Sequence, residues 1–206
     1  MRGKLRYFVQ SVNSIGLRKT LNKILFGYLY INKFMVLRLS LEKPFRYTEK
    51  NQFLKVKEIS LEDLHRMRND YPGLPIEFYC DEIQGFSTPY VAFVNNEIAA
   101  ISWLVFPGEN SRFLIIGEND AELNYITVLP QFRGKGIAKS LMAHIIQACK
   151  YNEIRNLWIV IHIDNIPQLK PTIQLGFYPV GIITHWGFYR PPKRFGPTEA
   201  RYVRKN

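Results

Sequence analysis

Short apolar runs and alternating apolar and polar positions recur along this chain, and both patterns are typical of β-strands. In one run, Leu37, Leu39 and Leu41 alternate with Arg38 and Ser40, which is the period of a half-buried strand. The predicted strands are Phe34–Leu41, Phe53–Ile59, Tyr90–Val94, Glu97–Phe106, Phe113–Ile116, Glu122–Leu129, Leu157–Ile163 and a late strand with His185, Trp186 and Tyr189.

The pair Asn95-Asn96 separates two of these runs, Tyr90–Val94 and Glu97–Phe106. Asn tolerates the positive φ that both central residues of a tight hairpin turn adopt. The two runs are therefore predicted to form an antiparallel hairpin with a two-residue turn.

Between the strands, apolar residues recur at the spacing of amphipathic helices. A stripe that begins at Ile137 returns every four residues as far as Cys149, and Ser60 with Asp63 forms a capping box at the start of another helix. Strands that alternate with helices predict an α/β domain. The predicted helices are Gly16–Tyr30, a short helix after Ser60, Leu74–Ile83, a long helix from Ile137, and a short or kinked helix with Pro167 and Pro171.

The chain of 206 residues, 47% of them hydrophobic, is long enough for one sizeable core and short for two. Its net charge is +11, and residues 1–52 carry +9 of it, with eleven Lys or Arg against two Glu. We therefore expect a basic N-terminal extension of one amphipathic helix and one strand over residues 1–52, followed by a single domain over residues 53–206.

The basic extension leaves several partners open. Residues 1–30 combine cations with apolar side chains, which suits either peripheral contact with an anionic inner membrane surface or docking on the domain or on a second copy in a homodimer. Nucleic-acid binding has only the charge in its favour, because no groove-reading motif is present. The apolar run Ile24–Ile31 is too short to span a bilayer, and we expect no signal peptide.

Cysteine and histidine spacing argues against disulfides and metals. Cys80 and Cys149 are far apart in the sequence, and the four histidines lack a ligand spacing. We expect no metal site, and a reducing cytoplasm suits the chain.

The segment before the long helix has the composition of an anion-binding loop. Gly134 and Gly136 allow a close approach to the backbone, and the first turn of a helix offers unpaired N–H groups and a positive dipole end. Arg133, Lys135 and Lys139 add positive charge, which suits a ligand with several phosphates. A dinucleotide fingerprint would need glycine at Lys139, and a nucleoside triphosphate loop would need Ser or Thr after its Lys, so both are excluded.

The run Gln131–Gly136 resembles the Gln/Arg-x-x-Gly-x-Gly/Ala signature of the GNAT superfamily of N-acetyltransferases, and the resemblance covers roughly residues 53–190. It implies a mixed, mostly antiparallel central sheet flanked by helices, with acetyl-coenzyme A (acetyl-CoA) as the donor. Further landmarks in the expected order are Val128-Leu129-Pro130, the strand Leu157–Ile163, Asn165 and Gly176-Phe177.

The resemblance also implies how the cofactor binds. Backbone N–H groups of residues 133–138 would hold its pyrophosphate, main-chain groups of residues 126–128 would pair with its pantetheine arm, and two strands would splay apart to admit the thioester. Asn165 would contact the pantetheine or adenosine side, or would instead be the N-cap of the next helix. The cofactor-binding residues expected on this basis are Ile126, Thr127, Val128, Gln131, Arg133, Gly134, Lys135, Gly136, Ile137, Ala138 and Asn165.

Acetyl transfer to an amine needs a base, and the resemblance implies Glu122 in that role. A solvated carboxylate at the start of a strand is the alternative interpretation. The usual acid of the family is a Tyr at the place of Thr172, so Tyr178 or Tyr125 would substitute, or water would protonate the thiolate. His162 at a strand end is a second candidate base, or a histidine packed in place.

Three carboxylates, Glu77, Asp81 and Glu82, fall in the region that commonly walls the acceptor site of this family. They would hold a cationic amine or form a solvated face. The expected function is N-acetyl transfer from acetyl-CoA to a primary amine of a small molecule, an amino sugar or amino acid. A protein or peptide amine is one alternative, and a non-catalytic acyl-CoA-binding module tethered by the basic helix is another.

Overall fold

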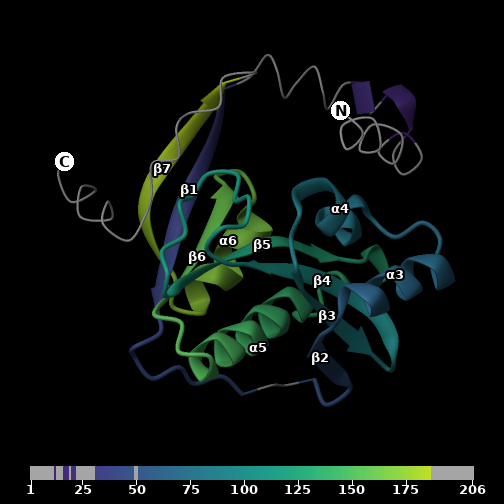
Figure 1. Cartoon of the computed structure of the whole chain (residues 1–206), viewed down its shortest axis with the longest axis horizontal. Coiled ribbons are helices and arrows are strands. Elements are labelled where there is room, and N and C mark those ends of the chain that lie inside the picture. The colour runs from purple at the N-terminus through teal and green to yellow at the C-terminus, as the bar shows by residue number, and fades with distance from the viewer. Residues whose placement is uncertain (1–11, 13–15, 19, 22–30, 49–50, 187–206) are drawn as a thin grey trace.

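A mixed sheet of seven strands runs through the described part of the chain, and the helices lie against its two faces (Figure 1). The computed structural model describes residues 12, 16–18, 20–21, 31–48 and 51–186. The strand order is β2-β3-β4-β5-β6-β1-β7. The strands are β1 (Ile31–Ser40), β2 (Leu54–Glu58), β3 (Thr88–Val94), β4 (Glu97–Val105), β5 (Asp120–Val128), β6 (Asn156–His162) and β7 (Tyr178–Trp186).

The helices agree with the predicted ones where they can be compared. Ser60 accepts a hydrogen bond from the backbone N–H of Asp63 at 3.0 Å, which confirms the predicted cap of α3. The predicted helix Gly16–Tyr30 lies mostly outside the described residues, as does Tyr189. The helices are α3 (Leu61–Asp70), a 3-10 turn at Ile76–Tyr79, α4 (Cys80–Gln84), a 3-10 turn at Pro130–Phe132, α5 (Ile137–Tyr151) and α6 (Ile166–Gln174). Within the described residues, none of the helices has the length and apolarity that crossing a bilayer requires.

The hairpin of β3 and β4 has the turn that its two asparagines predict. Asn95 has φ 50° and Asn96 has φ 66°, and Val94 pairs with Glu97 across the turn. Almost all other strand pairs are antiparallel too, and β5 with β6 is the parallel pair. The expected mixed, mostly antiparallel sheet is therefore confirmed.

Strand β1 lies inside the sheet rather than beside it. It pairs antiparallel with β6 on one side and with β7 on the other, and Val36 and Leu37 at its centre are fully buried. The strand expected in the N-terminal extension is thus confirmed, with bounds Ile31–Ser40. The division of the chain at residue 52 stays a prediction, but β1 shares one sheet with the residues that follow it (Figure 1).

The strand predicted over Phe113–Ile116 is reduced to an isolated β-bridge at Leu114. Phe113 and Leu114 bury their side chains against Val36 and Trp158 of the sheet. A short apolar run is equally suited to pairing in a sheet and to covering one, so periodicity alone did not separate the two.

Alternate residues of β4 show that the helices cover opposite faces of the sheet. Leu104 packs in the cluster that α5 and α6 form with the sheet, whereas Trp103 and Val105 pack in the cluster with Leu64 of α3 and Phe78. Because successive strand side chains point to opposite faces, α5 and α6 lie on one face and α3 and α4 on the other. A third cluster, around Phe113, Trp158 and Val36, covers the second face over β6, β1 and β7.

The segment between β1 and β2 runs along α5 (Figure 1). Lys150 near the end of α5 donates to the carbonyl of Lys43 at 2.6 Å, and the hydroxyl groups of Tyr47 and Ser140 lie 2.8 Å apart near its start. Residues 43–48 therefore extend along α5, with Lys43 near its C-terminal end and Tyr47 near its N-terminal end.

Candidate active site

The parallel strands β5 and β6 separate soon after they begin. They pair at only three positions, Asp120 with Asn156, Ala121 with Leu157 and Glu122 with Trp158, and the rest of both strands has no pairing between them. The expected splaying of these two strands is confirmed.

A bulge lies in β5 beyond this point. On β4, Ile101 pairs with Thr127 and Trp103 with Asn124, so two residues of β5 oppose one of β4. Tyr125 takes the extra place with φ 50°, a left-handed conformation that an aromatic residue seldom adopts and that costs on the order of 1–3 kcal/mol. The bulge directs Tyr125 into the cluster with α3 and α4, while Ile126 packs with the cluster around α5.

Glu122 stands at the last paired position before β5 and β6 separate. It is 1% exposed, so the alternative of a solvated carboxylate is wrong. Its partner Trp158 points to the face opposite α5, and cross-strand partners share a face, so Glu122 lies on the side of α3 and α4. A buried carboxylate at a fork in the sheet is suited to take a proton from a group held there.

Tyr125 is the second titratable group on this face. Its ring lies 6.0 Å from that of Phe86, centre to centre. Burial raises the pKa of Tyr125 to about 12, with the negative charge of Glu122 adding to the rise and the positive charge of Arg112 opposing it.

His162 ends β6 on the open side of the fork and is held by neighbours. The backbone N–H of Asp164 donates to its Nδ1 at 3.2 Å, so in the neutral ring the proton sits on Nε2, which lies 3.3 Å from Oδ1 of Asn32. Its ring also meets Phe34 edge-on at 5.2 Å between centres. The side chain is 32% exposed. These contacts favour the histidine packed in place.

Tyr178 and Thr172 are not brought to the fork. Two strands, β6 and β1, separate β5 from the strand of Tyr178, and its hydroxyl accepts a hydrogen bond from Nε of Arg38 at 2.6 Å. Thr172 is fully buried, and its hydroxyl donates to the carbonyl of Gln168 at 2.7 Å. Of the tyrosines considered as a substitute acid, the structure places only Tyr125 beside Glu122.

The glycine loop opens α5 as expected. Gly134 has φ 76° and Gly136, the residue before the helix, has φ 77°, and no side chain caps the first helical turn. A Cβ atom added at either glycine would meet nothing within 4 Å, so the loop has open space on the side where side chains would point. These features fit a pyrophosphate, which backbone N–H groups bind without a side chain in the way.

The other cofactor-binding candidates divide by burial. Ile137 is buried in the core, so only its backbone can face a ligand, whereas Gln131 is exposed. Arg133 donates from Nε to the carbonyl of Val128 at 3.1 Å, which ties the loop to the end of β5. The half-buried residues are Ile126, Thr127, Val128 and Ala138.

Asn165 directly precedes α6 but makes no side-chain cap to the helix. Its side-chain amide instead donates to Oε1 of Gln168 at 2.9 Å. The N-cap position is confirmed, and the hydrogen bond that a capping side chain would make is not found.

The sequence did not indicate that the segment between β1 and β2 borders the glycine loop. A hollow of about 410 Å³ next to the loop has walls from both. Its lining residues are Tyr47, Thr48, Asn51, Lys135, Gly136, Lys139 and Ser140.

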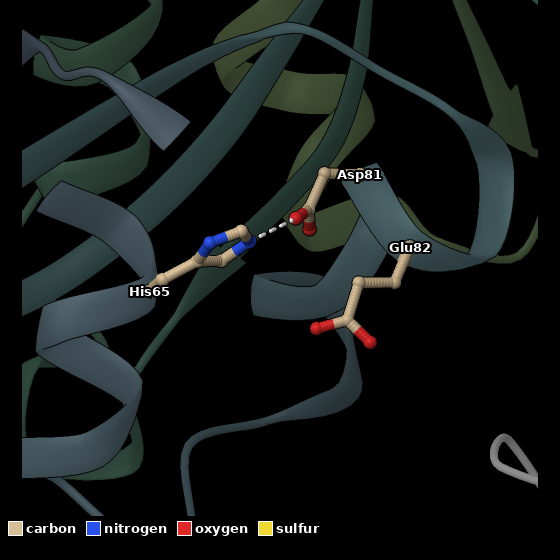
Figure 2. Close-up of side chains that lie close together, drawn as sticks. All are labelled: His65, Asp81 and Glu82. Carbon is tan, nitrogen blue, oxygen red and sulfur yellow. Dashed lines mark hydrogen bonds and ion pairs between the residues drawn. The ribbon is translucent and has the colours of Figure 1, made fainter. Parts of the chain in front are cut away.

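Three side chains of metal-binding type, His65, Asp81 and Glu82, lie together between α3 and α4 (Figure 2). His65 Nε2 is 2.9 Å from Asp81, but the buried guanidinium of Arg68 already bonds Asp81 and, at 2.9 Å, Glu82. The cation of this cluster is thus Arg68, and we assign no metal to it. Asp81 and Glu82 accordingly have a cation already, which argues against their holding a cationic amine. Glu82 is nevertheless exposed, in agreement with the interpretation of a solvated face.

Comparisons with known proteins agree with this geometry. The sequence profile of the Acetyltransferase (GNAT) family matches residues 53–177. The comparison with curated sequences returned no match.

Several solved structures share the fold. An acetyltransferase of the GNAT family from Novosphingobium aromaticivorans is 14% identical with a TM-score of 0.53, covering 75% of this chain and 63% of its own. A GCN5-related N-acetyltransferase from Sphaerobacter thermophilus is 11% identical with a TM-score of 0.53, covering 83% and 56%. A GCN5-related glucosamine N-acetyltransferase region of a fungal β-N-acetylglucosaminidase is 14% identical with a TM-score of 0.56, covering 81% and 22%.

The chain spans less than two thirds of the length of each of these structures. At such identities the likeness concerns the fold alone. Because the family profile covers more than half of the chain and the sheet, fork and glycine loop accord with it, the chain belongs to the GNAT family of acetyltransferases.

Proposed function

We propose that this enzyme transfers acetyl from acetyl-CoA to a primary amine of a small molecule, an amino sugar or an amino acid, by direct attack of the amine. The observation that carries the proposal is Glu122, a carboxylate 1% exposed at the last paired position of the fork between β5 and β6. A protonated amine cannot attack an acyl group, and Glu122 is the acidic side chain at the fork that can take its proton, directly or through a water.

Acetyl-CoA would supply the activated acyl group. The backbone of residues 133–138 would hold its pyrophosphate at the start of α5, and the backbone of residues 126–128 would bind its pantetheine arm along the unpaired edge of β5. Asn165 would contact the pantetheine or adenosine side. The open side of Gly134 and the uncapped first turn of α5 support this placement.

Tyr125 is the side chain best placed to assist the leaving thiol, in preference to Tyr178. A thiol has a pKa of about 8.5, so a phenol whose pKa burial raises to about 12 would give up its proton to a thiolate only against the equilibrium. We therefore assign Tyr125 a hydrogen bond to the sulfur rather than complete proton transfer, and water protonates the thiolate. His162, held by Asn32 and Asp164, orders the β6 side of the fork.

The burial of Glu122 favours a slender acceptor, since an amine must reach a group that has almost no contact with solvent. A lysine side chain or a peptide N-terminus also meets this condition and is the alternative class. We place the enzyme in the cytoplasm, where its cysteines Cys80 and Cys149 remain free and buried. Peripheral membrane contact through residues 1–30 and a homodimer stay predictions.

The test is release of free thiol from acetyl-CoA in the presence of amino acids, amino sugars and short peptides. We expect steady turnover, with many equivalents of thiol per enzyme, for at least one small amine. Turnover with peptides alone would show that the acceptor is a peptide or protein amine rather than a small molecule. Cofactor binding without turnover on any amine would contradict the proposed acetyl transfer and support the alternative of a non-catalytic acyl-CoA-binding module.

A further inference from the structure

Arg112 lies on the segment between β4 and β5 and is seated on two aromatic rings. Its guanidinium carbon is 4.6 Å from the centre of the Phe113 ring and 5.4 Å from that of Phe34. The two rings are themselves 4.7 Å apart. Aromatic contacts of this kind hold a guanidinium in place, and its planar fork of N–H groups matches the oxygens of carboxylates and phosphates.

The position of Arg112 relates it to both strands of the fork. Phe34 pairs with His162 at the end of β6, and their rings are in contact at 5.2 Å. On the other side, the positive charge of Arg112 lowers the pKa of Tyr125 in β5, against the effect of burial. Phe34 and Phe113 both pack in the cluster of Trp158, the cross-strand partner of Glu122. Arg112, seated on these two rings, therefore lies on the sheet face that carries Glu122, near the end of β6.

Glu122 and Arg112 place two opposite charges on this face. Burial is the main cause of the raised pKa of Tyr125; the carboxylate of Glu122 adds to the rise and the guanidinium of Arg112 opposes it. An amine that also carries an oxyanion has the complementary pair of charges, since its amine suits Glu122 and its oxyanion suits Arg112. Such complementarity selects one partner over uncharged ones more than it adds affinity.

We propose that Arg112 binds an oxyanion group of the acceptor, so that the preferred substrate is a small amine that also bears a carboxylate or a phosphate. This inference rests on the proposed function and narrows it. A neutral amino sugar or a simple alkylamine would be a poor acceptor.

The experiment compares kcat/KM for two matched pairs of amines at saturating acetyl-CoA. One pair is β-alanine and β-alaninamide, and the other is glucosamine 6-phosphate and glucosamine. The variants are Arg112→Met, which keeps a long apolar side chain on the rings, and Arg112→Lys, which keeps the charge and removes the fork. Arg155→Met is the matched control, because it removes one positive charge at the opposite end of β6.

We expect the wild type to have a higher kcat/KM for the charged member of one pair than for its neutral partner. The pair that shows this preference identifies the bound group as a carboxylate or a phosphate. Arg112→Met should lower kcat/KM for that amine about ten- to hundredfold, as for loss of a hydrogen bond between charged groups, and for its neutral partner less than threefold. The kcat/KM of Arg112→Lys for the charged amine should lie between those of the wild type and Arg112→Met. The control Arg155→Met should have the kcat/KM of the wild type.

Equal losses for both members of a pair in Arg112→Met would show that Arg112 only holds its loop, and would overturn the inference while the proposed function stands. A wild type that favours the neutral amines would do the same. No turnover with any amine would overturn the proposed function and this inference with it.

Discussion

Glu122 shows how far burial changes the chemistry of one residue. A carboxylate at an exposed strand start mainly interacts with water. Glu122 instead pairs with Val105 of β4 on one side and with Trp158 of β6 on the other. It is the last of the three paired positions before β5 and β6 separate. If Glu122 is the base, as proposed, its burial leaves it in contact only with groups that enter the fork.

The first prediction concerns that base. Glu122→Gln keeps the shape of the side chain and removes its ability to accept the proton of the amine. We expect kcat to fall by about a hundredfold or more, with the Kd of acetyl-CoA unchanged within a factor of about three. Steady-state thiol release and a binding titration give the two numbers.

The matched control is Glu97→Gln, which makes the same change at an exposed position at the start of β4. It should leave both numbers at their wild-type values. A Glu122→Gln variant that turns over at the full rate would remove Glu122 from the mechanism.

At the scale of elements, local patterns predicted most of what the structure contains. The turn at Asn95 and Asn96, the cap at Ser60 and the glycine loop before α5 each depend on residues close in sequence, so their patterns carried the information. The bounds of β5 and β6 followed from the same kind of pattern to within two residues.

What the sequence did not indicate depends on contacts between distant residues. Strand β1 was expected as a strand, but its place between β6 and β7 follows from pairing with residues more than a hundred positions away. The contact of Tyr47 with Ser140 and the bond of Tyr178 with Arg38 are of the same kind. The pattern of apolar and polar side chains predicts which face of an element is buried, but it does not predict which other elements pack or pair with it.

The sequence also did not predict the bulge in β5. Tyr125 has the composition of an ordinary strand residue, and no glycine marks its positive φ. Only the register of β4 against β5 shows that one residue is extra. Strained backbone at such a position is common next to functional sites, which agrees with its place beside Glu122.

For the whole molecule, the insertion of β1 makes residues 31–40 part of the same sheet as the domain that follows. Phe34 from β1 packs on Phe113 and His162, so this strand contributes to the sheet face on which the proposed acceptor binds. The segment that follows β1 runs along α5 and borders the glycine loop. Both sides of the proposed reaction thus depend on residues that precede the part matched by the family profile, 53–177.

The burial of the thiols predicts a loss of stability in alkali. Burial raises the pKa of Cys149 to about 12 from an ordinary value of 9.0, and it raises the pKa of Cys80 as well. Above pH 9 the unfolded chain loses these protons first, so each thiol lowers the free energy of unfolding by up to about 1.4 kcal/mol per pH unit until its folded pKa is reached. Below pH 9 the contribution is fully present.

We expect the melting temperature of Cys149→Ala, measured under reducing conditions, to fall less steeply between pH 9 and pH 11 than that of the wild type. Ile145→Val is the control, because it removes a methylene from the same buried stripe of α5 and no titratable group. It should keep the wild-type slope. Parallel curves for wild type and Cys149→Ala would show that the thiol titrates normally in the folded protein.

The central claim is that the glycine loop at the start of α5 holds acetyl-CoA, and thermal melting with the ligand tests it most directly. The proteins compared are the wild type, Gly134→Val and Gly73→Val, a control whose glycine has φ 97° and open space around it, away from the loop. At a hundred times its Kd, a ligand adds about 2.7 kcal/mol, or roughly 5–10 °C for a domain of this size.

We predict such a shift for the wild type and for Gly73→Val with acetyl-CoA and with free CoA, no shift with ATP or NAD, and no shift with any of them for a folded Gly134→Val. An unchanged melting temperature of the wild type at millimolar acetyl-CoA, or an undiminished shift in Gly134→Val, would contradict the account.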